Sequence, residues 1–375
     1  MKPTIIVTHY LPHIGGLELA TYYLAKELSK KDNDIHIITP SPNNKKRELD
    51  TKIKIHRHPV NTYPDEQKLW AFIDGILFFR RALRTIKEIQ PDIIHSQNIT
   101  NSIPAYIAWR KYHIPYVICI HGNLELMGPF LLKPLKRFWP KLPYIKSASE
   151  IISLTPEMGD RIEKELGRKS VVIPNGVDLE RFFPIPKKNS NTENLTIITV
   201  SRIDDKKGLE YAIHSMPKIL ENYPKTKLKI LGDGDYRSHL EQLTVALGLE
   251  KSVEFTGSIP NTEVPSHLQN AEIFLLPSLF EGLPLTLLES MACGLPVIST
   301  PVSVAPGIIE KWNNGIIVPF KSPDAIADAI ITLLSNQNLR EKYAKNSADA
   351  AKETMSWKSV AEQYNSLYQS VIESN

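Results

Sequence analysis

Two glutamates lie in a segment that is otherwise almost entirely apolar, residues 280–298. Glu281 and Glu289 are separated by seven residues, with Pro284 placed where a helix can begin and Gly294 where that helix can end. One carboxylate therefore precedes the predicted helix and the other lies two turns along it. A carboxylate among apolar side chains is costly unless it has a partner. Glu289 is therefore a candidate ligand-binding group, and a solvated edge residue or a buried ion pair is the structural alternative.

Two cations lie close together in a loop that follows a predicted strand. Arg202 comes directly after the strand at 196–200, and Lys207 follows five residues later, at the predicted start of a helix. Both side chains can therefore converge on one anion at the mouth of the sheet, and a diphosphate suits such a pair. Isolated lysines and arginines in loops are usually solvated, so this prediction rests on the combination.

Two further candidate positions follow strands in the first half of the chain. Gly15 and Gly16 come after the first predicted strand and open a helix, where glycines let backbone N–H groups approach a phosphate or a sugar. A tight turn is the alternative for this pair. His121 ends the strand at 116–120, and an ordinary strand-end histidine explains it as well as a functional one does. Ligands of open parallel sheets bind outside the carboxyl ends of the strands, which gives all these positions weight.

The sequence contains no complete dinucleotide fingerprint. The nearest match, Gly232 and Gly234, has Arg237 in place of the third glycine of G-x-G-x-x-G, which argues against a nicotinamide enzyme. Asp233 and Asp235 form a D-x-D of the metal-binding kind, but a glycine-rich turn that needs short residues explains them better. We therefore expect neither a metal ion nor a cofactor.

Short β-branched runs alternate with longer helical patterns along the chain, which is typical of parallel βαβ units. In the first half the pattern predicts strands at 4–8, 35–39, 53–56, 92–96, 116–120, 150–154 and 171–173, and helices near 17–30, 69–89, 102–112 and 156–166. In the second half it predicts strands at 196–200, 227–231, 253–255, 273–276, 296–299 and 316–318, helices near 207–222, 236–247 and 284–293, and a helical tail from 324.

The two series of strands predict two Rossmann-like, doubly wound α/β domains facing a central cleft. The length of 375 residues agrees with two domains of ordinary size. A polar stretch without apolar periodicity separates them, so we expect an N-terminal domain over 1–183, a linker over 184–194 and a C-terminal domain over 195–355. The amphipathic segment 356–375 is expected to pack back across the interface as a helix.

Composition excludes several classes of protein. No apolar run reaches the roughly 20 residues needed to span a bilayer, and the N-terminus is typical of a first buried strand and not of a signal peptide. Cys119 and Cys293 each lie beside apolar residues, as buried thiols in a reducing compartment do. We therefore expect a cytoplasmic protein without a disulfide.

Charge is distributed unevenly. Residues 1–180 hold 26 Lys and Arg against 19 Asp and Glu, a balance of +7, and the remainder holds 19 against 22, a balance of −3. Segment 131–146 has five cations, no acids and several large apolar residues. This interleaving suits an anionic membrane surface, which would make the protein peripheral at the inner face of the membrane. An irregular loop is an equally good interpretation, because prolines interrupt the segment. No nucleic-acid partner is expected.

Together these motifs resemble glycosyltransferase family 4 of the GT-B fold, the retaining group 1 glycosyltransferases, along nearly the whole chain. The matching pieces, in order, are residues 13–18, 174–178, 201–202 with 207–208, 231–234, the two glutamates of 281 and 289, 294–297 and 314–315. Each piece is modest alone, but their shared order is specific.

The resemblance implies a role for each candidate side chain. Arg202 and Lys207 would bind the diphosphate of a nucleotide-sugar donor, and Glu289 would bind the ribose hydroxyls. Glu281 would contact the transferred sugar, and His121 would lie near it. Glu281, His121, Arg202 and Lys207 would form the catalytic group.

The resemblance also implies contacts from backbone groups at two places. These positions are Gly15 and Gly16, in a loop that would close over the donor, and Gly282, Leu283 and Leu285, whose amides would help to hold the phosphates. Two departures from the family border the donor sugar. Residues 303–307 replace a Gly-Gly pair and a following glutamate, and Pro284 stands where many members have glycine.

The implied activity is retaining, metal-independent transfer of a sugar, of the hexosyltransferase type, from a UDP- or GDP-sugar, with UDP favoured. The acceptor would be a glycan or a lipid-linked molecule in cell-surface polysaccharide or glycolipid synthesis. Attack on the same face would place charge on the leaving diphosphate, which Arg202, Lys207 and a helix N-terminus would stabilise. A nucleotide-sugar epimerase of the same overall fold and a nucleotide-sugar-binding protein without turnover are the alternatives.

Overall fold

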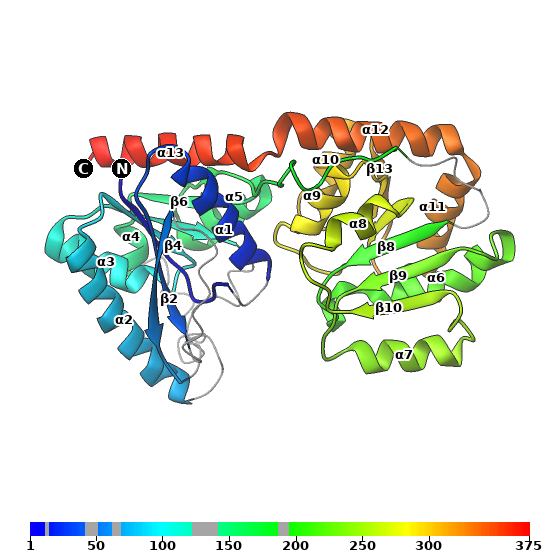
Figure 1. Cartoon of the computed structure of the whole chain (residues 1–375), viewed down its shortest axis with the longest axis horizontal. Helices are drawn as coiled ribbons and strands as arrows, with labels where there is room; N and C mark the ends of the chain where they lie inside the picture. Colours follow the sequence, from blue (N-terminus) through cyan, green and yellow to red (C-terminus); the bar gives the residue numbers. More distant parts are fainter. Residues whose placement is uncertain (12–14, 42–51, 62–68, 122–141, 187–194) are drawn as a thin grey trace. The chain divides into compact units, whose positions relative to one another are not determined.

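The computed structural model describes the chain except for residues 12–14, 42–51, 62–68, 122–141 and 187–194 (Figure 1). The chain forms two compact units. The first comprises Met1–Gly176 together with Trp357–Asn375, and the second comprises Val177–Ser356.

The first unit is built on a seven-stranded sheet in which every neighbouring pair of strands is parallel. Its strands lie in the order β3-β2-β1-β4-β5-β6-β7. They are β1 (Pro3–Ile6), β2 (Ile35–Ser41), β3 (Ile53–Pro59), β4 (Ile93–Gln97), β5 (Tyr116–Ile120), β6 (Glu150–Ser153) and β7 (Val171–Val172). The helices are α1 (Gly16–Ser29), α2 (Leu69–Ile89), α3 (Ser102–Tyr112), α4 (Pro143–Lys146), α5 (Pro156–Leu166) and α13 (Trp357–Glu373).

Helices cover both faces of this first sheet. Apolar side chains of α2, α3, α4 and α5 share one core with alternate strand residues such as Ile6, Ile38 and Ile118. The neighbours Ile5 and Ile37 are buried as well but outside that core, because successive side chains of a strand point to opposite faces. Helix α1 packs against α13, and the two lie side by side in Figure 1. The first unit is therefore a doubly wound α/β fold.

Buried polar contacts hold the C-terminal helix α13 on the first unit. The hydroxyl of Tyr368 lies 2.6 Å from Nδ1 of His95 on β4, and the hydroxyl of Tyr364 lies 3.4 Å from Sγ of Cys119 on β5. Burial lowers the pKa of His95 to about 3, so its ring is neutral at pH 7. Trp357 stacks on Tyr23 of α1. The last helix of the chain is thus part of the fold of the first unit.

The second unit repeats the arrangement with six parallel strands in the order β10-β9-β8-β11-β12-β13. They are β8 (Thr196–Val200), β9 (Lys227–Leu231), β10 (Val253–Gly257), β11 (Ile273–Leu276), β12 (Val297–Ser299) and β13 (Gly315–Ile317). The helices are the 3-10 turn η3 (Asp205–Lys207) and α6 (Leu209–Asn222), α7 (Arg237–Ala246), α8 (Val264–Gln269), α9 (Leu285–Ala292), α10 (Ala305–Trp312), α11 (Pro323–Ser335) and α12 (Gln337–Thr354).

Two cores flank the second sheet. One contains side chains of α6, α7 and α11, and the other contains side chains of α8, α9, α10 and α12. The strand order of both units reverses direction after the first strand, between β1 and β4 in one sheet and between β8 and β11 in the other. Ligands of doubly wound sheets bind at this switch point, outside the carboxyl ends of the strands. In the second unit the carboxyl ends of β8 and β11 lead into the loops that carry Arg202 and Glu281.

The structure confirms the α/β class and the two Rossmann-like halves. The compact units divide between Gly176 and Val177, seven residues before the end predicted for the N-terminal domain. The backbone N–H of Val177 donates to the carbonyl of Met355 at 2.6 Å, and Phe182 lies in a core of the second unit, so residues 177–183 fold with that unit. Most of the predicted linker, 187–194, lies outside the described residues. Within the described ranges, no helix combines the length and the hydrophobicity needed to cross a membrane.

Candidate functional site

The loops that follow β8 and β11 contact each other through their backbones. Gly208 has a φ of +61°, and a Cβ at this position would lie 2.2 Å from the carbonyl oxygen of Pro277. The N–H of Leu279 donates to the carbonyl of Lys206 at 2.7 Å. Only glycine allows this close approach without displacing the backbone. The turn that carries Lys207 is therefore held against the loop that carries Glu281.

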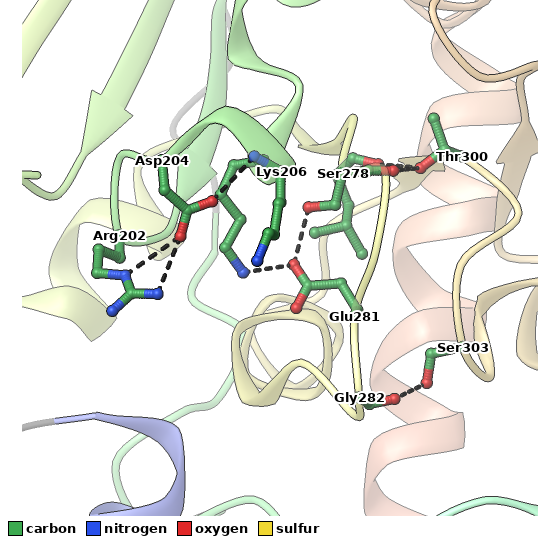
Figure 2. Close-up of polar contacts among 10 residues, drawn as sticks. Arg202, Asp204, Lys206, Ser278, Glu281, Gly282, Thr300 and Ser303 are labelled. Carbon is green, nitrogen blue, oxygen red and sulfur yellow. Dashed lines mark hydrogen bonds and ion pairs between the residues drawn. The ribbon is translucent and has the colours of Figure 1, made fainter. Parts of the chain in front are cut away.

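This contact produces a shielded ion pair. Nζ of Lys207 donates to Oε1 of Glu281 at 2.9 Å, and the hydroxyl of Ser278 donates to the same oxygen at 2.8 Å (Figure 2). The Lys207 side chain is 20% exposed and the Glu281 side chain 10%. Charge-assisted hydrogen bonds of this kind are among the stronger ones in proteins, and partial burial limits their screening by salt. The two side chains therefore lie in fixed positions at the carboxyl edge of the sheet.

Arg202 lies in the same loop as Lys207 but has a different partner. Its guanidinium donates to Oδ2 of Asp204 from Nε at 3.2 Å and from Nη2 at 3.1 Å (Figure 2), and its side chain is 78% exposed. An exposed pair contributes little to stability, so an incoming anion can replace Asp204 at small cost. The convergence of Arg202 and Lys207 on one anion stays a prediction.

The D-x-D segment has a structural role in the turn after β9. Gly232 and Gly234 have φ values of +135° and +158°, and a Cβ would lie 1.9 Å from the carbonyl oxygen of Ser201 in the first case and 2.3 Å from that of Ile203 in the second. Asp233 accepts from the N–H of Gly234 at 2.8 Å. The turn thus supports the loop that carries Arg202. Among the described residues, no three His, Cys, Asp or Glu side chains come together as metal ligands would.

Glu289 lies on α9, whose limits agree closely with the predicted ones. Pro284 is the N-cap residue of this helix, and Gly294, with a φ of +73°, follows its C-terminus. Glu289 is 7% exposed. Burial raises the pKa of its carboxyl to about 7, and the positive charge of Arg181 counteracts part of this rise. Near neutral pH this group is balanced between its protonated and ionised forms, so hydrogen-bond donors from a ligand would favour ionisation.

The remaining candidates in the second unit lie between these two glutamates. Leu283 and Leu285 are buried, Gly282 is half-buried, and Leu285 is the first residue of α9. The first N–H groups of a helix have no partner within the helix and suit an anion. Phosphate binding by the amides of Leu283 and Leu285 stays a prediction.

Three predicted positions belong to the first unit. Gly15 is the N-cap residue of α1, and the helix begins at Gly16 as the sequence predicts. Nε2 of His121 is hydrogen-bonded to Oε1 of Gln97 at the carboxyl end of β4. Burial lowers the pKa of His121 to about 4, so the ring is neutral at pH 7. The roles of these residues toward a ligand stay predictions.

The sequence does not single out three contacts of the site in the second unit, Arg181, Ser278 and Thr300, and it marks Ser303 only as part of the departing segment 303–307. Arg181 supplies the positive charge that acts on Glu289, and Ser278 is bonded to Glu281. Thr300 donates to the carbonyl of Ser278 at 2.5 Å, and Ser303 donates to the carbonyl of Gly282. Ser278, Thr300 and Ser303 are marked only by their position after β11 or β12, which is too common to single out a hydroxyl residue, and Arg181 precedes the first strand of the second sheet.

Two family models match the chain in consecutive halves. The model described as "Glycosyltransferase Family 4" matches residues 14–181, and the one described as "Glycosyl transferases group 1" matches residues 181–350. The second match includes all the candidate residues of the second unit, and the first includes Gly15, Gly16 and His121.

Relatives and solved structures agree with these matches over the full chain. Alpha-monoglucosyldiacylglycerol synthase of Acholeplasma laidlawii is 24% identical over 100% of this chain and 98% of its own length. Sucrose-phosphate synthase from Thermosynechococcus elongatus has a TM-score of 0.88 at 20% identity, with 100% of both chains covered. Anabaena Alr3699/HepE in complex with UDP-glucose has a TM-score of 0.78 at 18% identity, over 99% of this chain and 100% of that chain. The structural likeness establishes a GT-B fold, and with both family models in the same order the chain belongs to the group 1 glycosyltransferases.

Proposed function

We propose that this chain is a retaining, metal-independent glycosyltransferase of the hexosyltransferase type that uses a UDP- or GDP-sugar. The observation that carries the proposal is the pairing of a nearly buried Lys207–Glu281 contact with the buried carboxyl of Glu289, both at the switch point of the second sheet. A fold neighbour has been solved in complex with UDP-glucose, and this supports our choice of a UDP-sugar over a GDP-sugar for this chain.

The ribose, the diphosphate and the transferred sugar of a nucleotide sugar each have a suitable partner in the second unit. The ribose hydroxyls can donate to Glu289, which replaces the water lost by burial with hydrogen bonds. The diphosphate can attract the exposed Arg202 away from Asp204, and Lys207, which has three N–H donors, can bond the diphosphate while it keeps its bond to Oε1 of Glu281. The second carboxylate oxygen of Glu281 can accept from hydroxyls of the transferred sugar.

The proposed reaction needs no nucleophile from the protein. The bond between the anomeric carbon and the diphosphate oxygen breaks, and its electron pair stays on the diphosphate. The acceptor hydroxyl forms the new bond on the same face and transfers its proton to the leaving phosphate oxygen. Lys207, Arg202 and the N-terminus of α9 stabilise the negative charge that develops, which is electrostatic preorganisation without a metal ion. His121 of the first unit is predicted to contact the donor sugar as a neutral ring.

The proposed acceptor is a glycan or a lipid-linked molecule, in cytoplasmic synthesis of a glycolipid or a cell-surface polysaccharide. The name of the relative from Acholeplasma laidlawii, which specifies a diacylglycerol glycolipid, supports a lipid acceptor. An epimerase would convert the donor alone, so incubation of the donor without any acceptor separates the two activities. A thermal-shift screen of UDP- and GDP-sugars would identify the donor.

The membrane prediction for segment 131–146 falls mostly outside the described residues, which resume at 142. The described part of the same unit offers support. On α2, the apolar side chains of Ile73, Ile76 and Leu77 are exposed on one face, and Arg80 and Arg84 continue that face toward the helix C-terminus. Apolar and basic side chains on one helix face suit the surface of an anionic membrane.

The first prediction concerns the diphosphate. Arg202→Ala and Lys207→Ala should each reduce kcat/KM by about 30- to 1000-fold, which corresponds to about 2–4 kcal/mol of transition-state stabilisation. Lys218→Ala, which removes an exposed lysine paired with Asp328 on another helix of the same unit, is the control and should behave as the parent. Parent-like turnover in both site variants would remove the diphosphate assignment.

The second prediction concerns Glu289. Folding raises the pKa of this carboxyl from 4.5 to about 7, so the ionised form is less favourable in the folded protein than in the unfolded chain. The free energy of unfolding of the parent therefore falls as the pH rises from 4.5 through 7. Glu289→Gln should therefore be more stable than the parent at pH 8, by up to about 3 kcal/mol, and equally stable near pH 4.5. The same variant should lose donor affinity. Urea unfolding at the two pH values measures the first effect, with Glu263→Gln as the exposed control. Lower stability of Glu289→Gln at pH 8 would contradict the account.

The third prediction concerns metal ions. Activity should survive EDTA, and Asp235→Asn should change it little, because the turn around Asp233–Asp235 serves to support a loop. Initial rates with EDTA, Mg²⁺ and Mn²⁺ test this. A strict requirement for either ion that Asp235→Asn abolishes would show that the D-x-D binds metal.

The fourth prediction concerns the membrane. Charge reversal of the cations of the basic segment, Lys133, Lys136, Arg137 and Lys141, to Glu should abolish co-sedimentation with anionic liposomes at low salt and leave donor affinity unchanged. The control makes the same change in charge on the second unit, at the exposed lysines Lys251, Lys321, Lys342 and Lys345. Parent protein that ignores anionic liposomes at low salt would refute the membrane proposal and favour a soluble acceptor.

A further inference from the structure

Three hydroxyl side chains fasten the loop that carries Glu281. The hydroxyl of Ser278 donates to Glu281, and Thr300 donates to the carbonyl oxygens of Ser278 at 2.5 Å and of Leu276 at 3.2 Å. The hydroxyl of Ser303 donates to the carbonyl of Gly282. Figure 2 shows these contacts on both sides of Glu281. We call Ser278, Thr300 and Ser303 the hydroxyl clasp.

The clasp determines which oxygen of Glu281 is available. Ser278 and Lys207 both donate to Oε1, at 2.8 and 2.9 Å. No hydrogen bond from the described residues reaches Oε2. A carboxylate held by two donors on one oxygen cannot rotate freely, and its second oxygen keeps its capacity to accept hydrogen bonds. Because Ser278 is a second donor beside Lys207, the clasp gives the carboxylate of Glu281 a defined orientation and so presents Oε2 in a defined direction.

Ser303 takes part in the clasp despite an unfavourable backbone. Its φ is +51°, in the left-handed region that non-glycine residues seldom occupy. A glycine would adopt this conformation at lower cost, so backbone conformation does not explain why a serine occupies this position. The hydroxyl bond to Gly282, the residue directly after Glu281, is what the side chain adds. Strain of this kind persists where the surroundings hold the residue in place, often near functional sites.

We propose that the hydroxyl clasp orients Glu281 toward the transferred sugar, and that Ser278 and Ser303 are positioning residues for that glutamate. The proposal rests on the donor-binding function proposed above. Within the described part of the chain, the side-chain hydrogen bonds of the clasp end on Glu281 and on backbone carbonyls, and none ends on Glu289 or Arg202. Loss of the clasp should therefore impair chemistry at the sugar and leave recognition of the nucleotide intact.

The test compares Ser278→Ala and Ser303→Gly with the parent. The release of UDP from UDP-glucose with water as acceptor measures turnover, and calorimetry with UDP alone measures nucleotide binding. Both variants should lower kcat about 10- to 100-fold, since small displacements of positioning groups have effects of this size. UDP affinity should stay within about twofold of the parent. Ser278→Thr keeps a hydroxyl and should restore most of the lost turnover, and Ser303→Gly should melt at the same temperature as the parent or higher.

Two control variants match the changes away from the clasp. Ser215→Ala removes a buried hydroxyl that donates to the carbonyl of Ala212 at 2.7 Å, and Asn313→Gly replaces another residue with a left-handed backbone, at φ +47°. Both should keep the kcat of the parent.

Two results would overturn the proposal that the clasp positions Glu281. One is a kcat within twofold of the parent in both Ser278→Ala and Ser303→Gly. The other is a fall in kcat that is matched by equal losses of UDP affinity and melting temperature, which would indicate a general structural role. UDP binding and turnover by the parent, measured first, test the proposed function separately from the clasp.

Discussion

The cost of burying a carboxylate is the constraint around which the site of the second unit is built. Helix α9 is buried along nearly all of its length, and Glu289 is the acid within it. Burial disfavours the ionised form strongly enough to raise its pKa to about 7, even with the charge of Arg181 nearby. A leucine in this position would leave the folded protein more stable, because its burial carries no cost of removing a carboxyl from water. The proposed function accounts for a glutamate there through hydrogen-bond donors that arrive with the ligand.

The rest of the site follows from how the chain reaches this helix. The loop after β11 carries Glu281 and leads into α9 at Pro284, so the two glutamates lie on either side of the helix N-terminus. The loop after β8 is drawn against it because Gly208 leaves room for the carbonyl of Pro277. One pair of adjacent strands therefore brings a lysine, a helix N-terminus and two carboxyls to the same edge. These groups suit the diphosphate, ribose and sugar of a nucleotide sugar.

Much of this could be predicted from the sequence, because it depends on local patterns. β-Branched runs locate the strands, and parallel strands place their following loops on one edge. The limits of α9 follow from Pro284 and Gly294, and the acid within it is unusual enough to single out. The type of fold and the candidacy of the two glutamates as site residues can therefore be predicted from the sequence.

The contacts that could not be predicted join distant residues or lack a pattern. Lys207 and Glu281 are 74 residues apart, and their pairing depends on the packing of two loops. Ser278, Thr300 and Ser303 are ordinary loop residues until their hydrogen-bond partners are seen. The division of the chain at Gly176 and Val177 depends on a backbone contact with Met355, far along the sequence. The helices α8 and α10, which have proline at their second position, are short and offer too few residues for periodicity.

The most direct test of the account is the proton balance of donor binding. Both phosphates of UDP-glucose are fully ionised at neutral pH, so protons released on binding come from the protein and are taken up by the buffer. Ribose hydroxyls that donate to Glu289 would ionise a carboxyl with a pKa of about 7. Calorimetry in buffers of different ionisation enthalpy should therefore show release of about half a proton at pH 7, falling toward zero by pH 9. Binding without proton release at pH 7, or with proton uptake, would contradict the assignment of Glu289 to the donor.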